Sequence, residues 1–342
     1  MTFRLLPLKP QPLTHSHIIS KQRLKESFAA VHSFAMRFFY ENLSKRVLED
    51  STAWEGLRDR IRWLPLLPSN SPDAKRMRVA ACIGALGSML AGLIFVPVYM
   101  DPDMGEIRNL LTDIYMTDHT REQHLRGVLL SVHPDVQQDI KRKRILHIIE
   151  TISLIFGRLL DDQTSDVFKE ELVQTCKVAV ECWDFVRQAR IKVDTMYPAF
   201  KGTEESAEQE QFTDKNWLPV PLPTSVIAST AKDSEHGDSQ KKGGPKLNGT
   251  AKQTGNGNVK ENTTKDGTLQ TASSGEQQQV AFERESIQRP VWPGFYVEDE
   301  LVKGYVLLTT QVKAAREELP TRRMQRQAHR NSSVQPKAPF LC

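Results

Sequence analysis

The feature that most constrains the fold is an uncharged, apolar segment over residues 79–100. A helix of about 20 apolar residues is long enough to cross a membrane, and this segment meets that length. Basic residues precede it and acidic residues follow it, so a membrane-spanning helix would leave the N-terminus in the cytoplasm. A helix that is apolar on all sides can equally be the central helix of a protein core.

Small residues recur every four positions in this segment. They are Ala80, Gly84, Ser88 and Gly92. A face of this kind lets a neighbouring helix approach closely, in a bilayer or in a protein core. The glycines, the serine and Pro97 weaken the segment as a membrane anchor, and amphipathic stretches lie on both sides of it. We therefore favour a buried core helix, and we retain a single-pass membrane protein anchored by residues 79–100 as the alternative.

Amphipathic periodicity predicts helices on both sides of this segment, because apolar residues recur there at steps of three and four. The expected helices cover residues 23–49, 54–63, 119–132, 135–160 and 165–195. Such helices must bury their apolar faces against one another. The sequence therefore predicts an all-α fold, a helical bundle of about six or seven helices over residues 21–199, behind a flexible leader over residues 1–20.

A polar stretch follows the predicted bundle. Between residues 229 and 279 there is no aromatic residue, and large aliphatic residues are rare. Ordering a backbone costs about 1–2 kcal/mol per residue, which so little apolar burial cannot offset. We expect a long disordered linker over residues 200–285. Within it, the proline-rich residues 217–223 are expected to form an extended spacer or to pack along the bundle.

A short apolar island lies beyond the linker. Residues 291–297 and 301–308 are rich in β-formers, and residues 298–300 would join them as the turn of a hairpin. Because two strands alone are only marginally stable, we expect a β-rich docking segment over residues 286–312 that packs on the helical domain. Docking on a partner protein is the alternative. A basic tail over residues 313–342 ends the chain.

Charge is distributed unevenly along the chain. The net charge is +4, and the tail carries a larger excess of basic residues than the whole chain does. The remainder is therefore near neutral, and binding to nucleic acid is not expected. Two basic groups are candidate contact or nuclear-import sites. They are Lys141, Arg142, Lys143 and Arg144 in a predicted helix, and Arg322, Arg323 and Arg326 in the tail. An ordinary solvated helix turn is the alternative for the first group.

No motif typical of catalysis, metal binding or cofactor binding is found. The cysteines lack Cys-x-x-Cys spacing, and the histidines lack the helical spacing of a metal-binding pair. Phosphate-binding glycine loops and a nucleophile elbow are also missing. We therefore expect no metal and no cofactor, and a non-enzymatic interaction or scaffold protein with an unknown protein partner. An enzyme with scattered active-site residues is a further alternative, which would gather His119, His124 or His147 with acidic residues in a pocket.

The small number of cysteines also bears on the compartment. Four cysteines in 342 residues are too few for a disulfide scaffold. Reduced thiols favour a protein of the cytoplasm or the nucleus. The alternative is a protein held in a membrane by residues 79–100.

Overall fold

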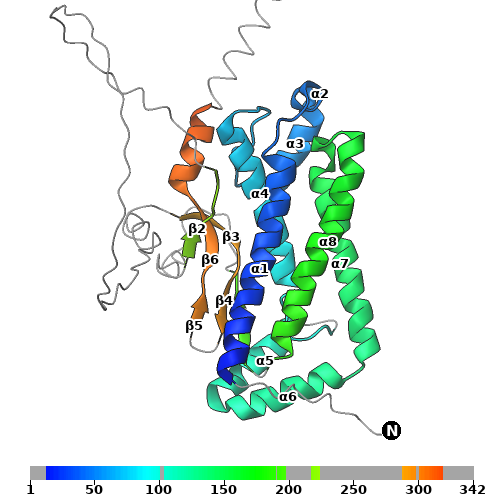
Figure 1. Cartoon of the computed structure of the whole chain (residues 1–342), viewed down its shortest axis with the longest axis vertical. Helices are drawn as coiled ribbons and strands as arrows, with labels where there is room; N and C mark the ends of the chain where they lie inside the picture. Colours follow the sequence, from blue (N-terminus) through cyan, green and yellow to red (C-terminus); the bar gives the residue numbers. More distant parts are fainter. Residues whose placement is uncertain are drawn as a thin grey trace, which may run out of the picture. The chain divides into compact units, whose positions relative to one another are not determined.

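The computed structural model describes residues 13–100, 104–189, 191–197, 217–223, 287–297 and 300–318. These residues are mostly helical, with short strands after the last long helix (Figure 1). The expected helical bundle followed by a β-rich C-terminal segment is therefore confirmed. The helices are α1 (Leu13–Phe39), α2 (Lys45–Glu49), α3 (Ser51–Arg60), α4 (Pro72–Leu93), α5 (Met104–Thr117), α6 (His119–Ser131), α7 (Pro134–Phe156), the 3-10 helix η1 (Gly157–Leu159) and α8 (Asp162–Arg187).

Side-chain caps fix where several of these helices begin. The side chains of Asp50, Ser71, Asp118 and Asp161 accept hydrogen bonds from the third backbone N–H of α3, α4, α6 and α8. Each cap satisfies a donor that has no partner inside the helix. The helix starts are therefore set by local sequence.

The first helix differs from the expectation at both of its ends. α1 begins at Leu13, so residues 13–20 of the expected leader 1–20 are helical, and residues 1–12 lie outside the described residues. The single helix expected over residues 23–49 is divided, because α1 ends at Phe39 and α2 is separate. The break has a long-range cause: the N–H of Leu43 donates to the Asn70 side chain at 2.8 Å instead of continuing the helix.

The helix expected over residues 165–195 is also shorter than predicted. α8 ends at Arg187, and residues 193–196 form a strand instead. The carbonyl oxygens of Arg187 and Ala189 accept hydrogen bonds from the Arg126 guanidinium, both at 2.8 Å. A residue on α6 therefore binds the backbone at the end of α8, which the periodicity of α8 alone cannot show.

Within the described residues, six strands form two small sheets. The strands are β1 (Val193–Met196), β2 (Trp217–Pro219), β3 (Ile287–Trp292), β4 (Gly294–Val297), β5 (Glu300–Val302) and β6 (Gly304–Leu308), in the orders β1-β4-β5 and β2-β6-β3. β4 and β5 form the expected antiparallel hairpin, with Tyr296 opposite Leu301. β3 pairs antiparallel with β6, and β2 pairs parallel with β6.

Part of the range expected as a linker, 200–285, is built into the second of these sheets. Trp217 and Val220 are buried, and β2 lies beside β6. The rest of that range lies outside the described residues. Residues 309–318, which begin in the docking segment and extend into the expected tail 313–342, are helical with Val312 buried. The remainder of the tail, from residue 319, lies outside the described residues.

Helix α4 is the core helix of the described part of the chain. It packs against α1, α7 and β3, and most of its residues are buried. In length and composition it could cross a membrane, but 67% of its most apolar window is buried inside the protein. The helix ends at Leu93, so residues 79–100 do not form one continuous helix. This is the packing expected of a core helix.

An aromatic cluster joins the C-terminal strands to the helices. The ring of Phe95, just after α4, lies 5.4 Å from Trp183 on α8, 5.8 Å from Trp292 on β3 and 5.4 Å from Phe295 on β4. These side chains are almost fully buried. The strands are therefore part of the same core as the helices.

Candidate functional site

On the predicted small-residue face of α4, the backbone at Gly84 lies against the Trp63 ring and Val291 of β3. Ala80 and Gly84 are buried, whereas Ser88 and Gly92 are exposed. A Cβ at Gly84 would lie 2.8 Å from the Trp63 ring. The closest approach on α4 is at a glycine outside the predicted set: a Cβ at Gly87 would lie 2.4 Å from a backbone oxygen of β3.

The basic group of α7 is divided around the helix. Lys141 is buried and its ammonium lies 2.6 Å from the Asp184 carboxylate on α8. The Arg144 guanidinium donates to the carbonyl oxygen of Leu93, at the end of α4, at 3.1 Å. Arg142 and Lys143 are exposed. Two of the four cations therefore hold α7 to its neighbours and two face outward, while Arg322, Arg323 and Arg326 lie outside the described residues.

A shallow groove of about 250 Å³ lies on the outer side of α7. Its lining is Ile140, Lys143, Arg144 and His147. This lining holds two cations, an imidazole and an aliphatic side chain, with no carboxylate among them. Figure 1 shows α7 at the edge of the helical layer, away from the strands.

The groove belongs to a longer stripe along α7. Residues at spacings of three, four and seven share one side of a helix. The stripe is Val136, Ile140, Lys143, His147, Glu150 and Leu154, which we call the α7 stripe. Its two end residues are aliphatic and unusually exposed, Val136 at 54% and Leu154 at 61%. The stripe is therefore aliphatic at both ends and basic at the groove, with one exposed carboxylate, Glu150, between the groove and Leu154.

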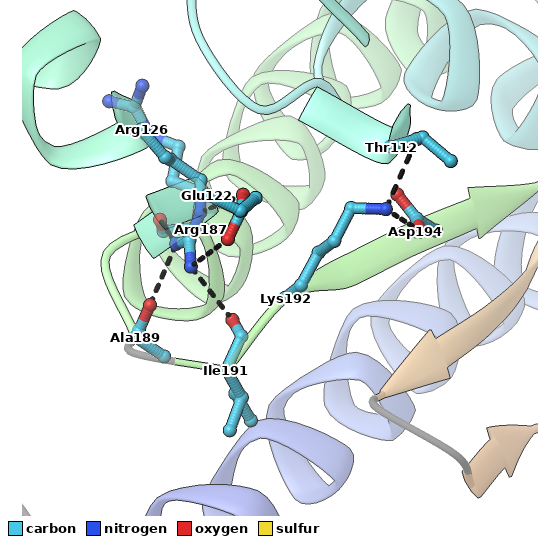
Figure 2. Close-up of polar contacts among 8 residues, drawn as sticks. All are labelled: Thr112, Glu122, Arg126, Arg187, Ala189, Ile191, Lys192 and Asp194. Atoms are coloured by element: carbon cyan, nitrogen blue, oxygen red, sulfur yellow. Dashed lines mark hydrogen bonds and ion pairs between the residues drawn. The ribbon is translucent and has the colours of Figure 1, made fainter. Parts of the chain in front are cut away.

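A second candidate site is a buried charge cluster where α5 and α6 meet the end of α8 (Figure 2). Arg126 and Glu122 on α6 are both buried, and the Arg126 Nε lies 2.9 Å from Glu122 Oε1. The same guanidinium donates to the backbone oxygens of Arg187, Ala189 and Ile191. One side chain therefore fastens α6 to three carbonyls of another part of the chain.

Lys192 forms a second ion pair beside the first. Its ammonium contacts the Asp194 carboxylate on β1 and lies 3.1 Å from the hydroxyl oxygen of Thr112 on α5 (Figure 2). Lys192 is buried, whereas the side chain of Asp194 is half-exposed. This pair joins β1 to α5 as Arg126 joins α6 to α8.

A small cavity of about 20 Å³ lies within this cluster. Its charged lining is Arg108, Glu122, Arg126, Arg187, Lys192 and Asp194. The lining therefore holds four cations and two carboxylates. Sequence reasoning missed this site, because its residues are scattered over α5, α6, α8 and β1. The only local signal was the spacing of four residues between Glu122 and Arg126, which is also typical of exposed helix pairs.

The described residues hold no cluster of metal-binding side chains. Cys82, Cys176 and Cys182 are buried free thiols. Burial raises the pKa of Cys176 to about 12 and also raises the pKa of the other two thiols. These three thiols are therefore protonated near neutral pH and are poor nucleophiles.

The histidines considered for an enzyme are not gathered in either of the two cavities described above. His119 stacks on Tyr115, with ring centroids 4.0 Å apart, and His124 is exposed. His147 lines the α7 groove without a carboxylate in the lining. Comparison with family models, curated proteins and solved structures finds no match for this chain.

Proposed function

We propose that this chain is a non-enzymatic interaction protein that binds an acidic, amphipathic helix of a partner protein on the α7 stripe. The observation that carries the proposal is the groove on α7, whose lining combines two cations with an aliphatic side chain and contains no carboxylate. Exposed aliphatic residues at both ends of the stripe extend this surface. The partner segment should carry carboxylates at its centre and aliphatic residues near its ends.

The dimensions suit a helix of ordinary length. Val136 and Leu154 are separated by about 27 Å along α7, at a rise of 1.5 Å per residue. Full burial of an aliphatic side chain of this size contributes about 1.5–3 kcal/mol. The basic centre would orient the partner helix and speed its association, and it would contribute less to the affinity. A partner helix of five turns would cover the whole stripe.

Charge favours a protein over a membrane surface or a nucleic acid. Each lysine or arginine near an anionic membrane contributes about 1 kcal/mol, so the two cations of the groove would give only weak attachment. Proteins that bind nucleic acids commonly make on the order of 6–10 phosphate contacts. The α7 groove offers Lys143 and Arg144. A short acidic helix matches this modest charge.

The burial of α4 supports an interaction protein over a protein anchored by residues 79–100. Alkaline carbonate extraction of membranes from expressing cells distinguishes a membrane-anchored protein from one that is not anchored. We expect the chain in the supernatant. Retention in the membrane pellet after extraction would contradict the core-helix assignment.

Site-specific photo-crosslinking tests the surface itself. A benzophenone amino acid placed at Lys143 should crosslink a protein through a segment rich in Asp, Glu and aliphatic residues. The matched control is the same amino acid at Lys177, an exposed residue on α8. The same products from both positions, or products with lipid or nucleic acid from position 143, would contradict the proposal.

Binding of the purified partner supplies the quantitative test. We expect Lys143→Glu to raise the dissociation constant at least tenfold, which corresponds to about 1.4 kcal/mol. Lys177→Glu should leave the constant unchanged. Equal effects of the two substitutions would show that the α7 stripe is not the binding surface.

A further inference from the structure

The cavity in the buried charge cluster carries more positive than negative charge. Arg126 is matched by Glu122, and Lys192 is matched by Asp194. These two pairs are locally neutral. Arg108 and Arg187 remain in the lining, and the lining offers no further carboxylate to either of them.

Arg187 shares its one carboxylate with a second cation. Its Nε lies 2.8 Å from Asp184 Oδ1, while the ammonium of Lys141 lies 2.6 Å from Asp184 Oδ2. One negative charge therefore serves two positive charges at this point. Arg108 forms no ion pair within the described part of the chain, so it adds a further uncompensated cation.

Arg187 also has an unused hydrogen-bond donor. Its side chain is 10% exposed, and its Nη1 is buried without a hydrogen-bond partner. The guanidinium lies over the Tyr99 ring, with its central carbon 4.4 Å from the ring centroid. A buried donor on a charged group is costly to leave unpaired. The ring covers one face of the guanidinium, and the unused N–H still lacks an acceptor.

The apolar part of the lining strengthens any electrostatic interaction inside the cavity. Leu111 and Trp183 line it and are each 1% exposed. Charges interact more strongly where water is excluded, because the local dielectric constant is lower than in bulk solvent. An anion in the cavity would meet the surplus cations in such surroundings.

We propose that this cavity binds one small monovalent anion, a halide ion or the carboxylate group of a molecule as small as formate. The volume of about 20 Å³ exceeds the roughly 10–15 Å³ that one water molecule requires. It is too small for a tetrahedral sulfate or phosphate. A water molecule could satisfy Arg187 Nη1 but would leave the surplus positive charge uncompensated.

The bound anion would join three helices. The cationic lining includes Arg108 on α5, Arg126 on α6 and Arg187 on α8. An anion that binds the folded chain and not the unfolded chain stabilises the folded state in proportion to its occupancy. Anion binding should therefore fasten the α5–α6 pair to the rest of the described fold.

Chloride-35 NMR and thermal unfolding of the full chain test the proposal. Protein should broaden the chloride resonance, and formate should reverse the broadening by competition. At constant ionic strength, with gluconate as the replacing anion, chloride should raise the unfolding temperature along a saturable curve. We expect about 3–5 °C at ten times the dissociation constant. Sulfate should not compete.

Two substitutions locate the site. Arg108→Gln and Arg187→Gln should each weaken chloride binding at least tenfold. Arg142→Gln removes an exposed arginine from α7 and should leave chloride binding unchanged. Because Arg187 also contacts Asp184, Arg187→Gln could impair folding. Arg108 is half-exposed and has no such contact, so its variant keeps the test decisive.

Three results would overturn the proposal. The first is a wild-type chloride resonance that the protein does not broaden. The second is equal stabilisation by chloride and gluconate at every concentration. The third is chloride binding that survives in the folded Arg108→Gln variant, since this would place the anion elsewhere. Competition by formate distinguishes a carboxylate-compatible site from one that accepts only halides.

Discussion

Arg78 is a charged side chain inside the core helix α4. It is 0% exposed, and its guanidinium donates to the backbone oxygens of Phe39, Glu41 and Ser69, at 3.3, 3.0 and 2.5 Å. Burial lowers its pKa from 12.5 to about 10, so the side chain stays charged at neutral pH. One arginine therefore closes the end of α1 and the loop before α4 in place of a local cap.

Replacing Arg78 should destabilise the protein strongly. Arg78→Met fills a similar volume but leaves three buried carbonyl oxygens without this donor. We expect the free energy of unfolding to fall by about 3–5 kcal/mol, measured by guanidinium chloride unfolding. Arg142→Met, at an exposed position on the neighbouring α7, should change it by about 0.5 kcal/mol or less. A similar small loss for both variants would mean that the backbone contacts of Arg78 add little.

The buried thiol of Cys176 links stability to alkaline pH. Its pKa rises from 9.0 to about 12 on burial, so between these values the unfolded chain ionises while the folded chain stays protonated. Its contribution to stability is therefore complete below pH 9 and is lost as the pH rises toward 12. Between pH 9 and pH 10.5 we expect Cys176→Ala to lose less stability than the wild type, by up to about 2 kcal/mol.

Thiol labelling checks the same residue by another route. Cys176 should resist a thiol reagent in the folded protein at pH 8 and react fully in guanidinium chloride, as judged by mass spectrometry of its peptide. Fast labelling of the native protein at this position would contradict the burial that raises the pKa. If the free energy of unfolding fell equally with pH in the wild type and in Cys176→Ala, groups other than Cys176 would cause the loss of stability at alkaline pH.

At the scale of elements, the contact between α4 and β3 depends on glycine. A Cβ at Gly87 would lie 2.4 Å from the Val291 carbonyl oxygen, which is closer than real Cβ contacts allow. Gly92 lies in the same helix with nothing within 4 Å of its Cβ position. The two glycines therefore form a matched pair, one required by packing and one not.

Alanine at these two positions should act in opposite directions. Gly87→Ala must push β3 away from α4, and overpacking of this kind costs about 1–3 kcal/mol. Gly92→Ala should stabilise the protein by about 0.5–1 kcal/mol, because alanine is the better helix former. Thermal unfolding followed by circular dichroism measures both. Stabilisation by both substitutions would show that β3 does not rest against α4 as described.

Helix periodicity identified the helical segments well but misplaced several of their ends. The apolar stripe of α8, including Phe168 and Trp183, is buried as the spacing predicts. The ends of α1 and α8, however, are bound by Arg78 and Arg126, whose backbone acceptors at those ends lie 37 or more residues away. Such contacts leave no periodic signal in the sequence. Local caps can be read from sequence, and these long-range contacts cannot.

The candidate sites differ in how visible they are from sequence. The run from Lys141 to Arg144 was visible as four cations, but which of them face outward depends on Asp184 and Leu93 in other helices. The charge cluster around Arg126 gave no comparable signal. Its members become a site only through the packing of α5, α6, α8 and β1.

At the scale of the whole molecule, the order of the second sheet changes the role of the polar stretch. β2 and β3 lie on either side of β6, so the residues that flank 224–286 belong to one sheet. The polar stretch therefore connects two strands of the same sheet.

This topology predicts unequal effects of two deletions. Strands two positions apart in a sheet are separated by about 10 Å, and the six residues left after removing 226–282 can span about 20 Å. Shortening the loop roughly tenfold lowers its closure cost by about 2 kcal/mol. The shortened chain should therefore unfold cooperatively at or above the wild-type temperature, measured by differential scanning calorimetry.

Removing residues 286–342 instead should destroy the cooperative transition, because Trp292 and Phe295 leave the aromatic cluster and the β3 face of α4 becomes exposed. The two variants lose the same number of residues, 57 each, so chain length cannot explain a difference between them. A truncated chain that melts like the wild type would mean that the strands merely rest on a complete helical core. Loss of the transition in the shortened chain would mean that the connection itself supports the fold.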